Sequence, residues 1–166
     1  METKQLLAEQ LAACYNQKNW FSPLQSALDG LTLEQASWKI VGGNSILQIV
    51  HHLYFWNERH LLRFKGIPVS PMPSDNDSTF ESGNAELTEA DWQSLMEKSF
   101  AVQAEFEKEI LNCTEEKLAS PVSNENKATW ESILSNANLH NAYHIGQIVL
   151  LRKMREVWDG RKNGVN

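Results

Sequence analysis

The amino-acid sequence predicts an all-α protein, a four-helix bundle with a long crossover loop. Four long segments place apolar residues three or four positions apart, which is the spacing of an amphipathic helix. No segment alternates polar and apolar residues over the length of a half-buried strand. A stretch rich in proline, serine, aspartate and asparagine at residues 68–83 separates the second and third segments. It is too long for a tight turn, so we expect it to cross the fold.

The first helix is predicted at residues 3–19. Its apolar residues recur about one turn apart, at Leu6, Leu7, Leu11, Cys14 and Tyr15. A short helical piece is expected at residues 22–28, with Ser22 as the N-cap and Pro23 in the first helical position. An Asp-Gly pair ends this piece, and residues 31–41 show no clear period.

The second long helix is predicted to begin at Asn44 or Ser45, both good N-cap residues, and to end near Lys65 before a Gly-Ile-Pro sequence. The crossover loop at residues 68–83 follows it. Neither side of this loop has enough helices to close a core alone. Residues 1–166 are therefore predicted to form a single domain.

The third helix is predicted at residues 88–111, because Thr88 can cap it and acidic residues occupy its first turn. A polar loop is expected at residues 112–127. The last helix should run from residue 129 to about residue 157. The tail from Gly160 onward is polar, and we expect it to be frayed.

Composition narrows the class of function. The chain has 166 residues, of which 42% are hydrophobic and 22% charged, as in ordinary globular proteins. Its formal net charge is −6, which argues against a nucleic-acid partner, because phosphate binding requires a basic surface. The same acidic balance gives no support to a membrane partner.

Cysteine usage and the start of the chain predict a cytoplasmic protein. Cys14 and Cys113 are far apart and do not form a CxxC motif, so a disulfide framework is not expected. The N-terminal residues lack the basic and apolar regions of a signal peptide. No apolar run approaches the roughly 18 residues that suggest a membrane span.

Two histidines in the last predicted helix are the first candidates for chemistry. His140 and His144 are four residues apart, so they lie on one face, one turn apart. At about 100° per residue they fall within about 20° of Ile133, on the apolar stripe of the helix. Two buried imidazoles in an apolar stripe are costly unless hydrogen bonds or a metal ion satisfy their nitrogens. The pair alone fits a metal site and two hydrogen-bonded core histidines equally well.

His52 is the predicted third ligand. On the second long helix it lies at the edge of the apolar stripe, beside Ile49 and Trp56, whereas His51 should face solvent. His60 is also on the core side, but it lies about 12 Å from His52 along the helix axis. The alternative is that His52 is an interface residue and His60 a packed or hydrogen-bonded one.

A site of His52, His140 and His144 would suit Zn²⁺, Ni²⁺ or a related divalent ion and would keep a coordination position open, as catalytic sites do. Asn141 and Gln147 are candidates to orient these ligands, although Asn141 could equally be an exposed helix residue. The His-Asn-Ala-Tyr-His sequence lacks the glutamate of HExxH, which disfavours a zincin protease.

The sequence offers little other chemistry. It contains no GxSxG, GxGxxG or Walker motif. Cys113 is a conceivable nucleophile without an assigned base, and a packing role suits it better. Glu58 and Glu131 are carboxylates near the histidine helices, but the simpler interpretation of each is a solvated helix residue. Catalytic residues are therefore not assigned.

Two segments together resemble the DinB-like superfamily of metal-binding helical bundles, which includes the YfiT-type proteins and the bacillithiol transferases. They are NSILQIVHHL at residues 44–53 and HNAYHIGQI at residues 140–148. The LDGL sequence at residues 28–31 and the order of the helices also fit. The resemblance implies an up-down-down-up bundle, often dimeric, in which His52, His140 and His144 hold a divalent metal.

The resemblance also implies a function. Superfamily members transfer low-molecular-weight thiols, and others carry out metal-dependent hydrolysis or isomerisation. We expect a metal-dependent enzyme that joins a small thiol to an electrophile. The alternatives are a metal-dependent hydrolase, a metal-binding bundle without turnover, and a bundle whose histidines are purely structural.

A homodimer is also expected. The last predicted helix is apolar over more than one face, because Leu139, Ile145 and Leu150 lie off the histidine stripe. Such a helix must be covered on several sides, and a second copy of the chain would provide one cover.

Overall fold

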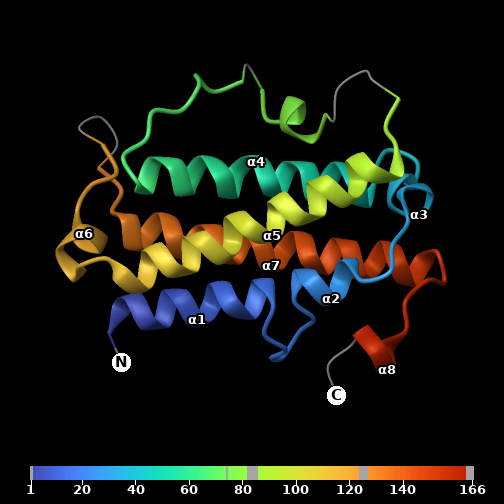
Figure 1. The fold of residues 1–166 in the computed structure, drawn as a ribbon, viewed down its shortest axis with the longest axis horizontal. Helices are drawn as coiled ribbons and strands as arrows, with labels where there is room; N and C mark the ends of the chain where they lie inside the picture. The colour runs from blue at the N-terminus through green and yellow to red at the C-terminus, as the bar shows by residue number, and fades with distance from the viewer. Residues whose placement is uncertain (1, 74, 82–85, 124–126, 164–166) are drawn as a thin grey trace.

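Four long helices lie side by side and form the body of the molecule (Figure 1). The computed structural model describes residues 2–73, 75–81, 86–123 and 127–163. The long helices are α1 Thr3–Tyr15, α4 Ile46–Phe64, α5 Glu89–Asn112 and α7 Trp130–Met154. α1 and α4 each pack against both α5 and α7. The part of the chain that the structure describes contains no β-strand, and the predicted all-α bundle is confirmed.

The chain follows the up-down-down-up order. In Figure 1, α1 and α7 run in one direction, and α4 and α5 run in the other. Because α4 and α5 are parallel, the connection between them must return along the full length of the bundle. This connection is the predicted crossover loop, and it contains a short 3-10 helix, η1 Asp77–Phe80. Residues 74 and 82–85 of the loop lie outside the described part.

Hydroxyl caps begin the three longest helices where the sequence predicts. Ser45 Oγ accepts a hydrogen bond from the Gln48 backbone N–H at 3.2 Å, and the Gln48 side chain accepts one from the Ser45 N–H at 3.0 Å. Thr88 and Thr129 cap α5 and α7 by the same hydroxyl contact. A fixed start for α4 and α7 also fixes which residues face each other across the bundle.

Four shorter helices join the long ones: α2 Leu24–Leu28, α3 Leu33–Ser37, α6 Glu115–Ala119 and α8 Gly160–Asn163. α3 and α6 were not predicted, because five residues are too few to show a helical period. Each begins with a threonine that is a typical N-cap residue. Thr32 accepts a hydrogen bond from the Gln35 N–H, and Thr114 accepts one from the Lys117 N–H.

Several expectations about where helices begin and end need correction. α1 ends at Tyr15 instead of residue 19, because the polar residues after it have no core to cover. The N-cap of α2 is Pro23 rather than Ser22, a shift of one residue. Part of the tail expected to be frayed is the helix α8.

The core consists of two apolar clusters at opposite ends of the bundle. One gathers α2, α3, the first half of α4 and the last part of α7 around Trp92 of α5. The other gathers α1, α6, the end of α4 and the start of α7 around Phe106 of α5. On α7 the clusters leave a gap between Leu134 and Ile145, and on α4 between Leu53 and Leu61. Buried polar residues occupy this gap, and it is where the candidate site lies. No helix in the described residues is long and apolar enough to cross a membrane.

A buried arginine links α2 to the chain after α7 at one end of the bundle. Arg152 is 4% exposed and donates to the carbonyl oxygens of Ala27 at 2.8 Å and Val157 at 2.9 Å, near the ends of α2 and α7. We expect Arg152→Met to lower the free energy of unfolding by about 2 kcal/mol, because it strands buried carbonyls. Urea denaturation would measure this loss. Arg155→Met is the control, because its 3.8 Å ion pair with Glu34 is at the surface; equal losses for the two variants would contradict the assignment.

Candidate metal centre

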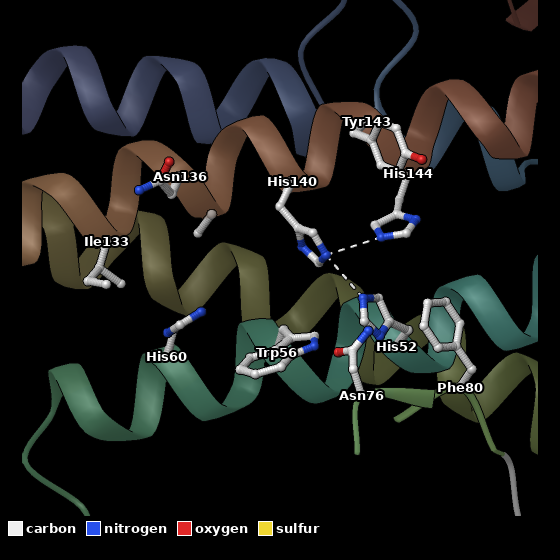
Figure 2. A pocket seen from close by; sticks show the side chains of 11 residues that line it. His52, Trp56, His60, Asn76, Phe80, Ile133, Asn136, His140, Tyr143 and His144 are labelled. Atoms are coloured by element: carbon white, nitrogen blue, oxygen red, sulfur yellow. Dashed lines mark hydrogen bonds between the residues drawn. The ribbon is translucent and has the colours of Figure 1, made fainter. Parts of the chain in front are cut away.

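Three histidines meet between α4 and α7 (Figure 2). His52 lies on α4, and His140 and His144 lie one turn apart on α7. Nε2 of His140 is 3.0 Å from Nε2 of His52 and 3.1 Å from Nε2 of His144. One nitrogen from each ring lies within 4.8 Å of the others. The structure therefore brings together the three residues chosen from the sequence, and we call them the histidine triad.

The crossover loop sets the orientation of His52. Nδ1 of His52 is 2.6 Å from Thr79 Oγ1, and this hydroxyl donates its hydrogen to the carbonyl oxygen of Asn76 at 2.6 Å. A hydroxyl has one hydrogen, so Thr79 must accept a hydrogen bond from Nδ1–H of His52. Nε2 of His52 then carries a lone pair toward the triad. Phe80 stacks on the same ring, with centroids 3.8 Å apart and planes 7° from parallel.

Gln147 sets the orientation of His144. Its carbonyl oxygen Oε1 is 2.6 Å from Nδ1 of His144, so Nδ1 donates and Nε2 again carries a lone pair. Two lone pairs thus point at Nε2 of His140. A single hydrogen on that atom satisfies at most one of them, whereas a metal ion accepts all three nitrogens. This shortage of donors is the feature of the triad that fits a cation.

Burial keeps the triad uncharged. His52 is 2% exposed and His144 is 6% exposed. Burial and the neighbouring imidazoles lower the pKa of His52 to about 3 and that of His140 to about 4, and burial also lowers the pKa of His144. At neutral pH all three rings are neutral, and the neutral imidazole is the form that binds a metal.

The spacing of the triad also suits a metal ion. Nitrogens bound tetrahedrally to Zn²⁺ at 2.0–2.1 Å lie about 3.3 Å apart. Two of the three separations in the triad, 3.0 and 3.1 Å, are close to this value, and all three lie within 4.8 Å. Among the residues that the structure describes, no fourth histidine, cysteine or carboxylate joins the triad. Three imidazoles leave at least one coordination position for another molecule.

The triad opens into a pocket of about 550 Å³ between α4 and α7. In Figure 2 the triad stands at one end, His60 and Ile133 stand at the other, and Trp56 lies between them. Phe80 and Tyr143 also line the pocket, and none of its described lining residues is acidic. A largely apolar pocket with a few polar groups is typical of a site for a small molecule.

Comparison with known protein families shows which family this chain is related to. Residues 19–148, most of the chain, match the family model described as the DinB superfamily. The chain belongs to the DinB superfamily. The matched range contains the whole triad, and the match assigns no subgroup within the superfamily. No curated protein and no solved structure matches the chain significantly.

The neighbours of the triad in this DinB protein are partly those expected. Gln147 contacts His144 as predicted. Asn141 does not, and it is not an exposed residue either, since it is 1% exposed. Its amide pairs with Asn57 of α4 in both directions, at 2.8 and 3.1 Å. His51 lies outside the triad, with Nδ1 3.1 Å from the Thr79 carbonyl oxygen.

The other reactive residues considered from the sequence lie away from the pocket. Cys113 is half-buried and donates to the Ile110 carbonyl oxygen at 3.1 Å. Glu58 accepts a hydrogen bond from the Tyr54 hydroxyl, and Glu131 is exposed. None of the three reactive residues lines the pocket of the triad. Cys113 and Glu131 have the packing and surface roles expected for them, whereas Glu58, expected to be solvated, is half-buried.

Sequence reasoning missed the contribution of the crossover loop. Thr79 and Phe80 both touch His52, but in the sequence they stand in a polar stretch without any period. Phe80, the one aromatic residue of this loop, was the only hint that the segment returns to the core. The tertiary path of the loop, which the sequence does not display, brings them to the metal centre.

Removing the Thr79 hydroxyl tests its role. We expect Thr79→Val to weaken binding of Zn²⁺ about 10- to 100-fold, because the variant leaves Nδ1–H of His52 unpaired and the ring free to turn. Competition with a chromophoric chelator measures the affinity. Ser78→Ala is the matched control, since among the described residues the Ser78 hydroxyl hydrogen-bonds only to the Asp75 carbonyl oxygen. An unchanged affinity in Thr79→Val would show that the hydroxyl does not orient the ligand.

Proposed function

We propose that this DinB protein is a metal-dependent enzyme that joins a small thiol to an electrophile, as the bacillithiol transferases of the superfamily do. His52, His140 and His144 would hold the ion, with Zn²⁺ or Ni²⁺ as the best candidates for three imidazoles. The observation that supports this proposal is the convergence of three Nε2 atoms beside an open pocket. A structural metal site would instead be closed by a fourth protein ligand.

The bound ion would lower the pKa of a coordinated thiol and hold it as thiolate. Thr79 and Gln147 keep the ligand rings in place, so little reorganisation is needed when the thiol arrives. Trp56 and Phe80 line the pocket beside the triad and would shield the sulfur from water. With an epoxide as the electrophile, a sulfur–carbon bond forms and a carbon–oxygen bond breaks. The thiol proton leaves to solvent, and the new alkoxide takes a proton from solvent.

The lack of carboxylates among the described residues of the pocket favours thiol transfer over hydrolysis. Metal-dependent hydrolases commonly use a carboxylate as a general base for the attacking water. None of the described residues lining the pocket is acidic. A thiol, in contrast, ionises near neutral pH once its pKa is lowered, so its attack needs no such base.

Parallel assays separate the candidate functions. Protein loaded with Zn²⁺ or Ni²⁺ is offered a thiol with an epoxide or a haloarene, and separately amide and ester substrates. We expect metal-dependent consumption of the thiol that His144→Ala abolishes. Turnover of the amides or esters alone would identify a hydrolase, and metal binding without any turnover would identify a non-catalytic bundle. If elemental analysis finds no bound metal near neutral pH, the role of the three histidines is structural.

A homodimer stays a prediction. The outer face of α7 exposes Leu139, Leu150 and Met154, by 67%, 57% and 52%. Covering these side chains with a second copy would remove apolar surface from water. Light scattering at micromolar concentration should give about twice the chain mass of 18.9 kDa. We expect Leu139→Lys to shift it toward the monomer, and a wild-type mass near 18.9 kDa would contradict the prediction.

A further inference from the structure

The pocket extends well beyond the metal centre. His52, Trp56 and His60 follow each other at four-residue intervals, so one face of α4 lines it from end to end. His52 and His60 are about 12 Å apart along the helix axis. Figure 2 shows the triad and His60 at opposite ends, with the Trp56 ring between them. A molecule that reaches both ends must therefore be elongated.

His60 has hydrogen-bonding capacity that the protein does not use. Its Nδ1 is sealed from solvent and has no hydrogen-bond partner among the described residues. The ring stacks on Trp56, with centroids 5.8 Å apart. A buried lone pair without a partner costs less than a buried N–H without one, so Nε2 carries the hydrogen. Because Nδ1 is enclosed, His60 can meet a molecule in the pocket only as a donor, through Nε2–H.

Two guanidinium groups, those of Arg63 and Arg59, act electrostatically on His60. Burial, assisted by the positive charges of Arg63 and Arg59, lowers the pKa of His60 to about 4. The guanidinium of Arg63 lies 5.9 Å from the centre of the Trp130 ring. No acidic residue is found among the described residues that line the pocket, although the chain as a whole carries a net charge of −6. This end of the pocket therefore favours an anionic acceptor over a neutral one.

We propose that His60 is a substrate-positioning residue that donates through Nε2–H to a carboxylate, at the end of an elongated thiol remote from its sulfur. This inference rests on the proposed function, because the sulfur occupies the open side of the metal centre. The apolar middle of the ligand lies along Trp56. The substrate class is therefore a long thiol acid rather than a short or uncharged thiol.

Four thiols test this proposal with the Co²⁺-loaded protein. They are mercaptoacetic acid, which is too short to reach His60, mercaptooctanoic acid, and the amide of each. The thiolate-to-cobalt absorption band reports binding at the metal, and its titration gives the affinity. His60→Phe keeps a ring beside Trp56 but removes the donor, and His60→Gln restores a side-chain N–H. Metal content and the circular dichroism spectrum check that each variant folds and retains cobalt.

Wild-type protein should bind mercaptooctanoic acid at least about tenfold more tightly than its amide, as a charge-assisted hydrogen bond provides. His60→Phe should reduce this ratio to less than about threefold, and His60→Gln should recover part of it. The ratio for the short thiol should not change. An unchanged ratio for the long thiol in His60→Phe, with the thiolate band present, overturns this inference alone. A missing band with every thiol overturns the proposed thiol chemistry and this inference with it.

Discussion

Replacing His52 with alanine is expected to lower the affinity for Zn²⁺ or Ni²⁺ by more than about 100-fold. This loss is larger than that caused by removing a residue that only hydrogen-bonds to a metal ligand. His51→Ala should change it by less than about threefold. The two histidines are neighbours on α4, yet only His52 directs Nε2 at His140, at 3.0 Å. His51 instead contacts the Thr79 backbone through Nδ1. Metal content after dialysis and chelator competition would measure both variants.

This pair of variants separates metal binding from general damage to α4. Each removes one imidazole from the same turn of the helix, so loss of helix stability should affect both alike. Equal metal content in the two variants would show that the triad does not hold the ion. A requirement for His51 and not His52 would mean that α4 binds metal in a different register from the one observed. Either result would remove the basis of the proposed function.

Helix identity was predictable because local signals and periodicity agree. Ser45, Thr88 and Thr129 mark the starts of α4, α5 and α7, and each accepts the expected backbone hydrogen bond. The helical wheel also selected His52 over His51 correctly as the histidine facing His140. These predictions required only the chain's own spacing, whereas the path of the crossover loop depends on contacts between distant residues.

The helical wheel was wrong about where the core of α7 is centred. On a period of about 100° per residue, the buried residues of α7 centre about 80° away from Ile133, at Asn141. Ile133 and His140 are only half-buried, and His140 lines the pocket at the edge of the core. His52 lies at the corresponding edge on α4. A site at the edge of two apolar faces can reach a ligand, and a site at the centre cannot.

The centre of the interface between α4 and α7 holds the pair of amides from Asn57 and Asn141. Asn57 is 3% exposed and Asn141 is 1% exposed. Asn57 Nδ2 also donates to the Leu53 carbonyl oxygen at 2.7 Å, so the pair is tied to the backbone of α4. Paired amides fit only one alignment of the two helices. We infer that they hold α4 and α7 in the alignment that brings the triad together.

Asn57→Ala and Asn141→Ala are each expected to lower the free energy of unfolding by about 3 kcal/mol, because each leaves the partner amide without its hydrogen bonds at a buried position. The double variant should lose clearly less than the sum, since the second substitution removes an amide that is already unpaired. Urea denaturation of the three metal-free variants gives this coupling. Additive losses would show that the two amides act independently. Ser99→Ala is the control for zinc affinity, because it removes a buried hydroxyl on α5. If zinc affinity falls in the single asparagine variants but not in Ser99→Ala, the amide pair aligns the ligands as well as stabilising the fold.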